Sequence, residues 1–468
     1  MRMILSMVLG IHMAACMTDA SADLAGAEDP EAAVQAPTTA NAVGSGLRQE
    51  IYVLRAGQNG YDVFAALQAG QTPKSLGLQP AQGLTVLTPT LEDFERKVLA
   101  QSAQATVDWD TPIAIGECIA SAPQDTVHVS DRHNVCTWGS FLYTQFLDEE
   151  PTGAAEFKLE LIGRAGYGSE FSSRHIHFTE SISDVDFIAA FETEAELWTN
   201  PDLRCIPVSG SNPCEVAESA FQRDTFSGWK LKTLNGPKTW TFSIHTSAGG
   251  GQAPGDVSKA EFFGSFTIVA PPGQLPPVQS VSLDGINMRW DHASYLSGGM
   301  ERDGAAIFDY IQPLVYHLTG QGVDEVAAHI KQALDEPGTT IPPDPDKFIP
   351  GGDPQHPLHR LYRHYSLNNN FRYQFNRQDA TRWCESPRPP GQQCDEFPFA
   401  ATYEGAAKWF YEGTSPRAFS AQLVNKEQNG IAGNIEQSFF LNNRVLDPGY
   451  DGNFHPTELD SFYLKIEP

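Results

Sequence analysis

The chain has 468 residues, which is long for one compact core and predicts about two to four domains. Apolar residues make up 41% and charged residues 19%, a composition typical of globular proteins and not of disordered or fibrous ones. The formal net charge of −27 argues against a general electrostatic binder of nucleic acid. With 40 Gly and 33 Pro, a mostly helical bundle is also excluded.

The acidic excess is unevenly distributed. Gln355 to Pro468 contain 11 Lys and Arg against 13 Asp and Glu, whereas the preceding residues contain 20 and 45. The last quarter of the chain is therefore the only part that would not strongly repel an anionic substrate.

Residues 1–22 are predicted to be an export signal. Arg2 is a minimal positive segment, and the largely apolar run Ile4 to Ala15 is too short to span a membrane. Elsewhere no apolar stretch approaches the length of about 18–20 residues that a membrane span needs.

Two interpretations of processing stay open. Met13-Ala14-Ala15-Cys16 is an imperfect lipobox, which would place a lipid anchor on Cys16. Ala20-Ser21-Ala22 is instead a site for a signal peptidase. Residues 23–47 follow as a flexible tether, and the protein is expected to be secreted or held at the cell surface.

Six cysteines remain after the signal, and an even number in an exported chain predicts disulfides. Six cysteines allow 15 pairings, and sequence-local pairing is the hypothesis because each pair lies in a loop-rich stretch. The absence of any C-x-x-C spacing disfavours a zinc site. The predicted pairs are Cys118–Cys136, Cys205–Cys214 and Cys384–Cys394.

Residues 48–104 form a mixed segment with a strand at Ile51–Leu54 and a helix at Thr90–Gln104. Residues 105–270 show apolar alternation of period 2, as at Phe157, Leu159 and Leu161, between turns rich in Gly, Pro, Ser and Asn. This pattern predicts a β-sandwich-like domain.

Residues 271–278 are rich in proline and are predicted to be a linker. A segment with helical periodicity follows within 279–468, ending at Pro337. Its apolar positions are Val323, Val326, Ala327, Ile330 and Leu334. The fold class is accordingly α+β, with several domains.

Familiar catalytic signatures are missing: there is no G-x-S-x-G, H-E-x-x-H, Walker A loop or strand-flanked G-x-G-x-x-G. His175 and His177 would share one face of a strand, where they either bind a metal or are two polar residues on an open face. His359 and His364 are five apart, so on a helix they would point in different directions.

The C-terminal segment carries an unusual constellation. It reads Asn376-Arg-Gln-Asp-Ala-Thr-Arg-Trp-Cys384, then Cys394-Asp-Glu-Phe-Pro-Phe-Ala400, then Tyr403-Glu-Gly405, and later Asn425-Lys-Glu-Gln-Asn-Gly430 and Phe439-Phe440. This constellation resembles the NucA/NucB family of secreted bacterial deoxyribonucleases, most strongly over 376–445. Phe397 stands where the family usually has Tyr, Trp290 where it often has Cys, and Asn429 intrudes in its N-x-x-Q-G element.

The resemblance implies a small nuclease domain over 279–468 with a strand–strand–helix (ββα) metal core like that of His-Me nucleases. It assigns the general base to Asp395. If Cys394–Ala400 is a strand, Glu396 points to the opposite face and supports the fold or the site. Glu404, at the turn after the strand, is a further candidate catalytic carboxylate.

Metal ligands are expected on the helix that begins near residue 426. Gln428 and Glu436 are eight apart and so lie near one face, and Asn425 precedes them at a cap-like position. Oxygen ligands of this kind suit Mg²⁺, Mn²⁺ or Ca²⁺ better than Zn²⁺. Arg377 and Arg382 are candidate phosphate-binding residues. Asn425 as a helix cap, Glu436 as a solvated residue and Arg377 as a structural ion pair stay open as alternatives.

The sequence thus predicts an exported, metal-dependent endonuclease that cleaves DNA with little sequence specificity, because no recognition helix with clustered basic residues is visible. Two alternatives stay open. One is a β-sandwich protein that binds a surface glycan or protein and carries a degenerate nuclease domain. The other is an antibacterial nuclease toxin.

Overall fold

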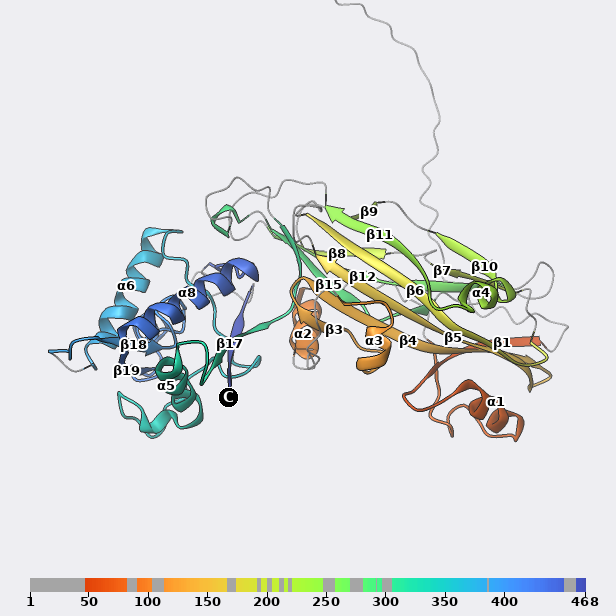
Figure 1. Cartoon of the computed structure of the whole chain (residues 1–468), viewed down its shortest axis with the longest axis horizontal. Coiled ribbons are helices and arrows are strands. Elements are labelled where there is room, and N and C mark those ends of the chain that lie inside the picture. Colours follow the sequence, from red (N-terminus) through yellow and green to blue (C-terminus); the bar gives the residue numbers. More distant parts are fainter. Residues whose placement is uncertain are drawn as a thin grey trace, which may run out of the picture. The chain divides into compact units, whose positions relative to one another are not determined.

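The computed structural model describes residues 47–81, 91–102, 113–165, 174–191, 195–199, 204–209, 214–217, 221–246, 257–269, 281–291, 293–296, 305–384, 387–449 and 460–468. Residues 43–468 form one compact unit (Figure 1). The predicted export signal with Cys16, the tether up to residue 46 and the linker at 271–278 lie outside the described residues.

The fold combines α-helices and β-sheets, so the predicted α+β class is confirmed. None of the helices in the described ranges is long and apolar enough to cross a membrane. The helices are α1 (Gly60–Gln68), α2 (Leu91–Ser102), α3 (Glu117–Ser121), α4 (Phe226–Thr233), α5 (Asp324–Asp335), α6 (Leu367–Thr381), α7 (Lys408–Glu412) and α8 (Lys426–Asn442).

A large antiparallel sheet dominates the N-terminal part of the compact unit (Figure 1). In spatial order its strands are β2 (Gln79–Pro80), β1 (Leu47–Leu54), β4 (Asn134–Leu147), β5 (Glu150–Ala165), β6 (His175–Ala189), β11 (Lys238–Thr246) and β9 (Cys214–Ala217), with β3 (His128–Asp131) paired to β4. The predicted strand at 51–54 and the predicted helix at 90–104 correspond to β1 and α2.

Two smaller sheets share a hydrophobic core with the large one. One has the order β10 (Gln222–Thr225), β7 (Glu196–Thr199), β13 (Ser265–Val269) and β14 (Val281–Ser282). The other has the order β16 (Ala305–Phe308), β15 (Ile286–Asp291), β12 (Val257–Phe263) and β8 (Arg204–Ser209). Phe157, Phe266 and Met288, one from each sheet, lie in that common core.

The sheets continue past the predicted linker. Strand β14 pairs with β13, and β15 pairs with β12, so residues on both sides of 271–278 build the same two sheets. The strands of these sheets end at Phe308, about 30 residues beyond the predicted start of the nuclease domain at residue 279.

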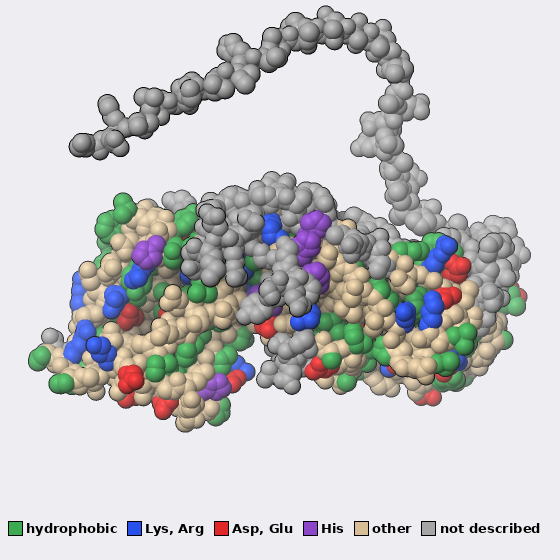
Figure 2. Space-filling model, turned by 45° about the horizontal axis from the view of Figure 1, so that its top comes forward, with side chains coloured by type: hydrophobic (Ala, Val, Ile, Leu, Met, Phe, Trp, Pro, Cys, Tyr) green, Lys and Arg blue, Asp and Glu red, His purple; other side chains and the backbone are tan. Residues whose placement is uncertain are grey.

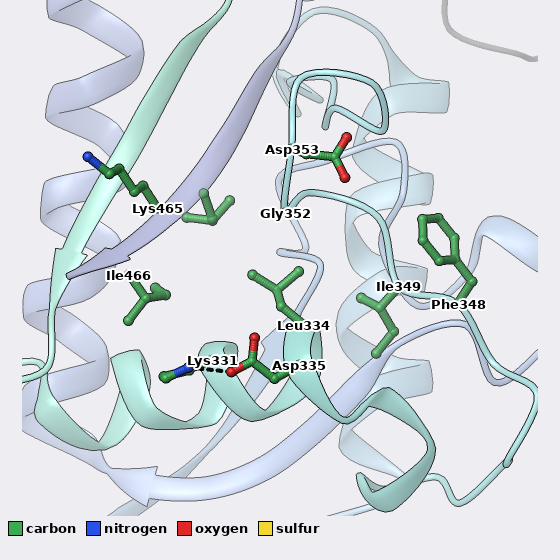
Figure 3. A pocket seen from close by; sticks show the side chains of 10 residues that line it. Lys331, Leu334, Asp335, Phe348, Ile349, Gly352, Asp353, Lys465 and Ile466 are labelled. Atoms are coloured by element: carbon green, nitrogen blue, oxygen red, sulfur yellow. Dashed lines mark hydrogen bonds and ion pairs between the residues drawn. The ribbon is translucent and has the colours of Figure 1, made fainter. Parts of the chain in front are cut away.

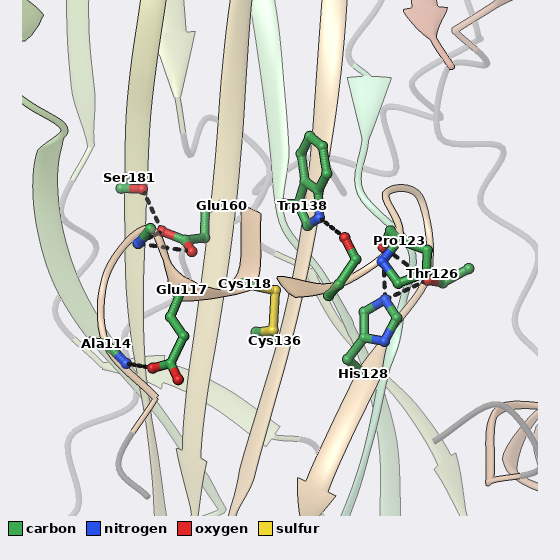
Figure 4. The surroundings of a disulfide bond; sticks show 12 residues. Ala114, Glu117, Cys118, Pro123, Thr126, His128, Cys136, Trp138, Glu160 and Ser181 are labelled. Atoms are coloured by element: carbon green, nitrogen blue, oxygen red, sulfur yellow. Dashed lines mark hydrogen bonds between the residues drawn. A yellow bond between two sulfur atoms is a disulfide. The ribbon is translucent and has the colours of Figure 1, made fainter. Parts of the chain in front are cut away.

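Strand β5 shows the predicted alternation only in part, because burial is continuous from Leu159 to Gly163. Phe157, Leu159 and Leu161 are buried, but Glu160 is also fully buried. Its two carboxylate oxygens accept the backbone N–H of Gly116, at 2.9 and 3.0 Å, and one of them also accepts the hydroxyl of Ser181 at 3.1 Å (Figure 4). A buried carboxylate is tolerated here because donors surround it.

The Gly116 contact fastens the short helix α3 to the large sheet. Cys118 of this helix is disulfide-bonded to Cys136 of β4 (Figure 4), and Cys384 is bonded to Cys394. Two of the three predicted pairs are thus confirmed. Cys214 is also disulfide-bonded, and the side chain of Cys205 lies outside the described residues.

The C-terminal part contains two two-stranded sheets within the described ranges. Strands β17 (Gln312–His317) and β20 (Phe462–Glu467) are parallel, and β18 (Gln392–Phe397) and β19 (Ser420–Asn425) are antiparallel. The predicted amphipathic helix is α5, whose buried face includes Val326, Ala327 and Ile330. These side chains pack in one core with Phe397 of β18 and Ala432 of α8.

Buried ion pairs join this C-terminal part to the sheets. Asp460, which precedes β20, accepts Arg132 at 2.6 Å and Arg289 of β15 at 2.7 Å. All three side chains are almost fully buried. Burial opposes the ionisation of Asp460, but the two arginines outweigh it and lower its pKa to about 2. Removing one member of such a group would leave an uncompensated buried charge.

The disulfide between Cys384 and Cys394 gives a first testable prediction. It closes a loop across a sequence separation of 10 residues that ends inside β18. In the chain-entropy account, a loop of this size contributes roughly 2–3 kcal/mol to the free energy of unfolding. We expect the Cys384→Ala/Cys394→Ala variant to lose about this much in urea denaturation. The matched Cys118→Ala/Cys136→Ala variant should lose a similar amount, and an unchanged free energy of unfolding in both would contradict the entropic account.

Candidate active site

The core of the candidate site is a strand–strand–helix unit formed by β18, β19 and α8. Helix α8 begins directly after β19, because the Asn425 side chain accepts the backbone N–H groups of Glu427 and Gln428 and so caps the helix. The cross-strand partner of Asp395 is Gln422, and that of Glu396 is Ala421.

Asp395 and Glu396 lie on opposite faces of β18, as strand geometry requires. The face of Asp395 packs against α5, where its Oδ2 atom lies 2.6 Å from His329 Nδ1. The face of Glu396 also carries Cys394, which packs with Ala380 of α6. The two neighbouring acids are therefore in contact with different helices.

Glu396 is half-buried and lies close to a second half-buried carboxylate, that of Glu436 of α8. Burial and the charge of Asp395 raise the pKa of Glu396 to about 8. Burial and the charges of Glu396 and Asp395 likewise raise the pKa of Glu436 to about 8, although Arg360 opposes the shift. The charge of Asp395 thus lies close enough to oppose the ionisation of both Glu396 and Glu436.

Two exposed arginines lie near this carboxylate cluster, which we define as Asp395, Glu396 and Glu436. Arg377 of α6 and Arg388, four residues before β18, both act electrostatically on Glu396 and favour its charged form. Both side chains are exposed, and Figure 2 shows Lys and Arg side chains on the visible face of the molecule. Arg382, the other predicted phosphate-binding residue, is instead paired with Asp379 at 2.9 Å.

The predicted metal ligands separate into two groups. Glu436 belongs to the carboxylate cluster. Asn425 caps α8, and Gln428 Oε1 accepts the backbone N–H of Glu325 at 2.7 Å, so both side chains hold helix ends. Asn429 instead lies against β18, where its side chain donates to the carbonyl of Cys394 at 3.5 Å.

Glu404 lies in a separate buried group. Its two oxygens interact with Nδ1 of His359 at 2.9 Å and accept the backbone N–H of the same residue at 2.8 Å. Burial opposes ionisation of Glu404, but the charge and hydrogen bonds of His359 outweigh it and lower the pKa. Both carboxylate oxygens of Glu404 are thus engaged by His359, and the catalytic role of Glu404 stays a prediction.

Glu396 and Glu436 offer oxygens that fit a hard divalent cation. Oε1 of Glu436 is buried without a hydrogen-bond partner among the described residues, and carboxylates with raised pKa values gain from a nearby positive charge. No group of three or more His, Cys, Asp or Glu in the described ranges is arranged to hold a metal ion as it stands.

No protein-family model matches the chain, and no curated protein and no solved structure is significantly similar to it. The geometry of the site therefore carries the functional argument.

Three residues of the site were not predicted from the sequence. His329 lies three residues after Val326, at the edge of the apolar face of α5. A histidine at such a position was the feature of the sequence that could have indicated a buried polar contact. Asn429 is seven residues before Glu436, close to two helical turns, which places both on one face of α8. Arg388 lies in a proline-rich loop, where no periodic pattern of residues indicates which side chains reach the site.

Two surface cavities lie among the described residues, and neither is lined by a residue of the carboxylate cluster. One of about 370 Å³ lies between α5 and β20, and its lining includes Leu334, Ile349 and Ile466 (Figure 3). Lys331 and Asp335 form an ion pair at its rim. These two residues lie on the side of α5 opposite His329, since each residue turns a helix by about 100°.

The predicted histidine pair of the large sheet also stands apart. His175 of β6 stacks on His245 of β11, with ring centroids 4.8 Å apart, and His177 is two residues further along β6. Burial lowers the pKa of both His175 and His177. Parallel stacked rings do not converge on a common ligand, so this group does not extend the candidate site.

The raised pKa values of Glu396 and Glu436 give a prediction for the metal-free protein. In the unfolded chain both groups ionise near pH 4.5, whereas in the folded state they ionise near pH 8. Stability is therefore lost as pH rises from about 4.5 to 8 and changes no further above it. We expect Glu436→Gln to be more stable than the wild type at pH 8 to 9, with the difference vanishing near pH 4.5.

The measurement is urea denaturation with a chelator across this pH range. Glu427→Gln, an exposed change on the same helix, is the control and should show no such trend. If the free energies of unfolding of Glu436→Gln and the wild type differ by the same amount at every pH, the raised pKa of Glu436 is contradicted.

Proposed function

We propose that the protein is a metal-dependent endonuclease that hydrolyses phosphodiester bonds of DNA with little sequence specificity. The observation that carries this proposal is the carboxylate cluster with Arg377 and Arg388 beside it. Phosphodiester hydrolysis requires carboxylates that bind a cation and, next to them, positively charged groups that bind the phosphate. The strand–strand–helix order of β18, β19 and α8 agrees with the family resemblance of this segment.

In this proposal Asp395 is the general base that takes a proton from the attacking water. Glu396 and Glu436 would hold a divalent cation of the Mg²⁺, Mn²⁺ or Ca²⁺ type. When bound, such a cation stabilises negative charge on the phosphate and the leaving oxygen. Glu396 thereby takes a more direct role than its sequence position implied, because it faces Glu436 and the arginines.

Arg377 and Arg388 would bind the phosphate and orient it over the cluster. Guanidinium groups form paired hydrogen bonds with phosphate oxygens, which adds geometric definition to the charge attraction. The region from Gln355 to Arg417, which supplies both residues, contains eight Lys and Arg against six Asp and Glu. The polyanionic substrate would thus approach the least acidic region of the chain.

An exported enzyme would meet DNA outside the cell. Two disulfides are compatible with such an environment, since they persist in oxidising compartments. Whether Cys16 carries a lipid anchor decides between release and attachment at the cell surface, and mass spectrometry of the exported protein distinguishes the two.

The central test is plasmid nicking by the purified protein with each divalent cation and with a chelator. We expect cleavage with at least one cation and none with chelator. Asp395→Asn should lower kcat by about 10²–10⁴-fold, because it removes the base and keeps the shape. Glu427→Gln should leave kcat unchanged, since its exposed side chain lies outside the cluster.

The same assay with RNA defines the substrate class. Wild-type protein that cuts neither nucleic acid with any cation would overturn the proposed function. An Asp395→Asn variant as active as the wild type would overturn the role of Asp395 alone.

The two exposed arginines give a separate prediction on binding. If each contacts one phosphate, Arg377→Gln and Arg388→Gln should each reduce the slope of log K against log salt by about 0.9. Arg382→Gln is the matched control on the same surface, because its guanidinium is paired with Asp379. Fluorescence anisotropy with labelled DNA at several salt concentrations measures the slopes, and equal losses in all three variants would contradict the assignment.

A further inference from the structure

Asp395 is the first member of a buried hydrogen-bonded chain. Its Oδ2 atom lies 2.6 Å from Nδ1 of His329, and Nε2 of His329 lies 2.7 Å from Oγ of Ser420. The exposed fractions of the three residues are 5%, 1% and 1%. The chain joins β18, α5 and the first residue of β19, across sequence separations of 66 and 91 residues.

The chemistry of the groups sets the direction of these bonds. A carboxylate only accepts hydrogen bonds, so Nδ1 of His329 carries the proton and donates it to Asp395. In the neutral imidazole, Nε2 then accepts the hydroxyl proton of Ser420. His329 thereby holds one of the two carboxylate oxygens of Asp395.

We propose that His329 and Ser420 are positioning residues that hold Asp395 in its catalytic orientation. This inference rests on the proposed function. A base contributes to catalysis only when its oxygen lies within hydrogen-bond reach of the proton that it removes. A partner on its far oxygen limits rotation of the carboxyl group, as second partners do for many catalytic and metal-binding side chains.

A second contact fixes the helix that carries His329. Glu325 lies one turn earlier on α5, and its Oε2 atom accepts the backbone N–H of Asn425 at 2.7 Å. Its own backbone N–H donates to Gln428 Oε1 at 2.7 Å. Helix α5 is thus tied to the junction of β19 and α8 as well as to Asp395, which keeps the imidazole in register with the strand.

The same Asp–His–Ser order occurs in serine hydrolases, but the surroundings of Ser420 do not fit a nucleophile. Its exposed fraction is 1%, although a surface cavity of about 340 Å³ touches the residue. The N–H of Ala421, which follows the serine, donates to the carbonyl of Ile341 at 2.7 Å. That group is therefore committed and does not serve an oxyanion.

The test compares two substitutions of His329 that retain different halves of the ring. In His329→Asn the amide nitrogen can occupy the place of Nδ1 and still donate to Asp395. In His329→Gln the longer amide reaches the place of Nε2 and loses the donor to Asp395. Positioning predicts that the Asn variant keeps kcat within about tenfold of the wild type. The Gln variant should lose about 10²-fold in kcat with KM little changed.

A purely structural role predicts the reverse order, because Gln is a better helix former than Asn. Thermal denaturation of both variants measures how much the difference in helix propensity changes the stability of the protein. Equal kcat values for the two variants, or a higher value for the Gln variant, would overturn the positioning role while leaving wild-type nuclease activity in place. Labelling of Ser420 by a fluorophosphonate would also overturn it, since the serine would then be a nucleophile.

A second measurement does not depend on activity. Nitrogen-15 NMR of the metal-free protein should show Nδ1 of His329 protonated, with the signal identified by its loss in His329→Asn. Ser420→Ala should shift the Nε2 resonance and leave the Nδ1 proton in place. An unprotonated Nδ1 contradicts the inference even if the protein cuts DNA. Wild-type protein that cuts no nucleic acid overturns the proposed function, and the positioning role falls with it.

Discussion

The alternation of side chains along β18 is the constraint on which the candidate site depends. Two adjacent acids on a strand cannot face the same way, so Asp395 and Glu396 need separate surroundings on the two faces. Helix α5 covers one face and α6 the other, and α8 lies along the strand and brings Glu436 to both acids. The crowding of negative charge follows directly from this arrangement, and it is the reason for proposing a compensating cation.

The sequence predicted local structure well where a period was present. The spacing of Val326, Ala327 and Ile330 located α5. The strand assumed at Cys394–Ala400 overlaps β18, which spans Gln392–Phe397. The partner of Asp395 could not be predicted in the same way. His329 is 66 residues away, and no local pattern links positions that meet only when β18 packs on α5.

The sequence could not decide between two roles for a side chain when both roles use the same atoms. An amide oxygen before a helix serves equally as a cap or as a metal ligand, and only the contacts of Asn425 show that it caps α8. Strands β15 and β16 were missed for another reason. Strand β16 is apolar at every position, so it lacks the polar alternation that marks a strand with one solvated face. In β15 apolar and polar residues do alternate, but its polar side chains are buried as well, so the pattern does not report a solvated face.

The buried ion pairs of Asp460 bear on how such a protein can evolve. Arg132 and Arg289 come from the sheet-forming part of the chain, and their shared carboxylate comes from the last ten residues. Recombination that exchanged the C-terminal segment for an unrelated one would leave the buried guanidinium groups of Arg132 and Arg289 without their shared carboxylate. The two parts are therefore expected to be inherited together, with Arg132, Arg289 and Asp460 changing as a set or not at all.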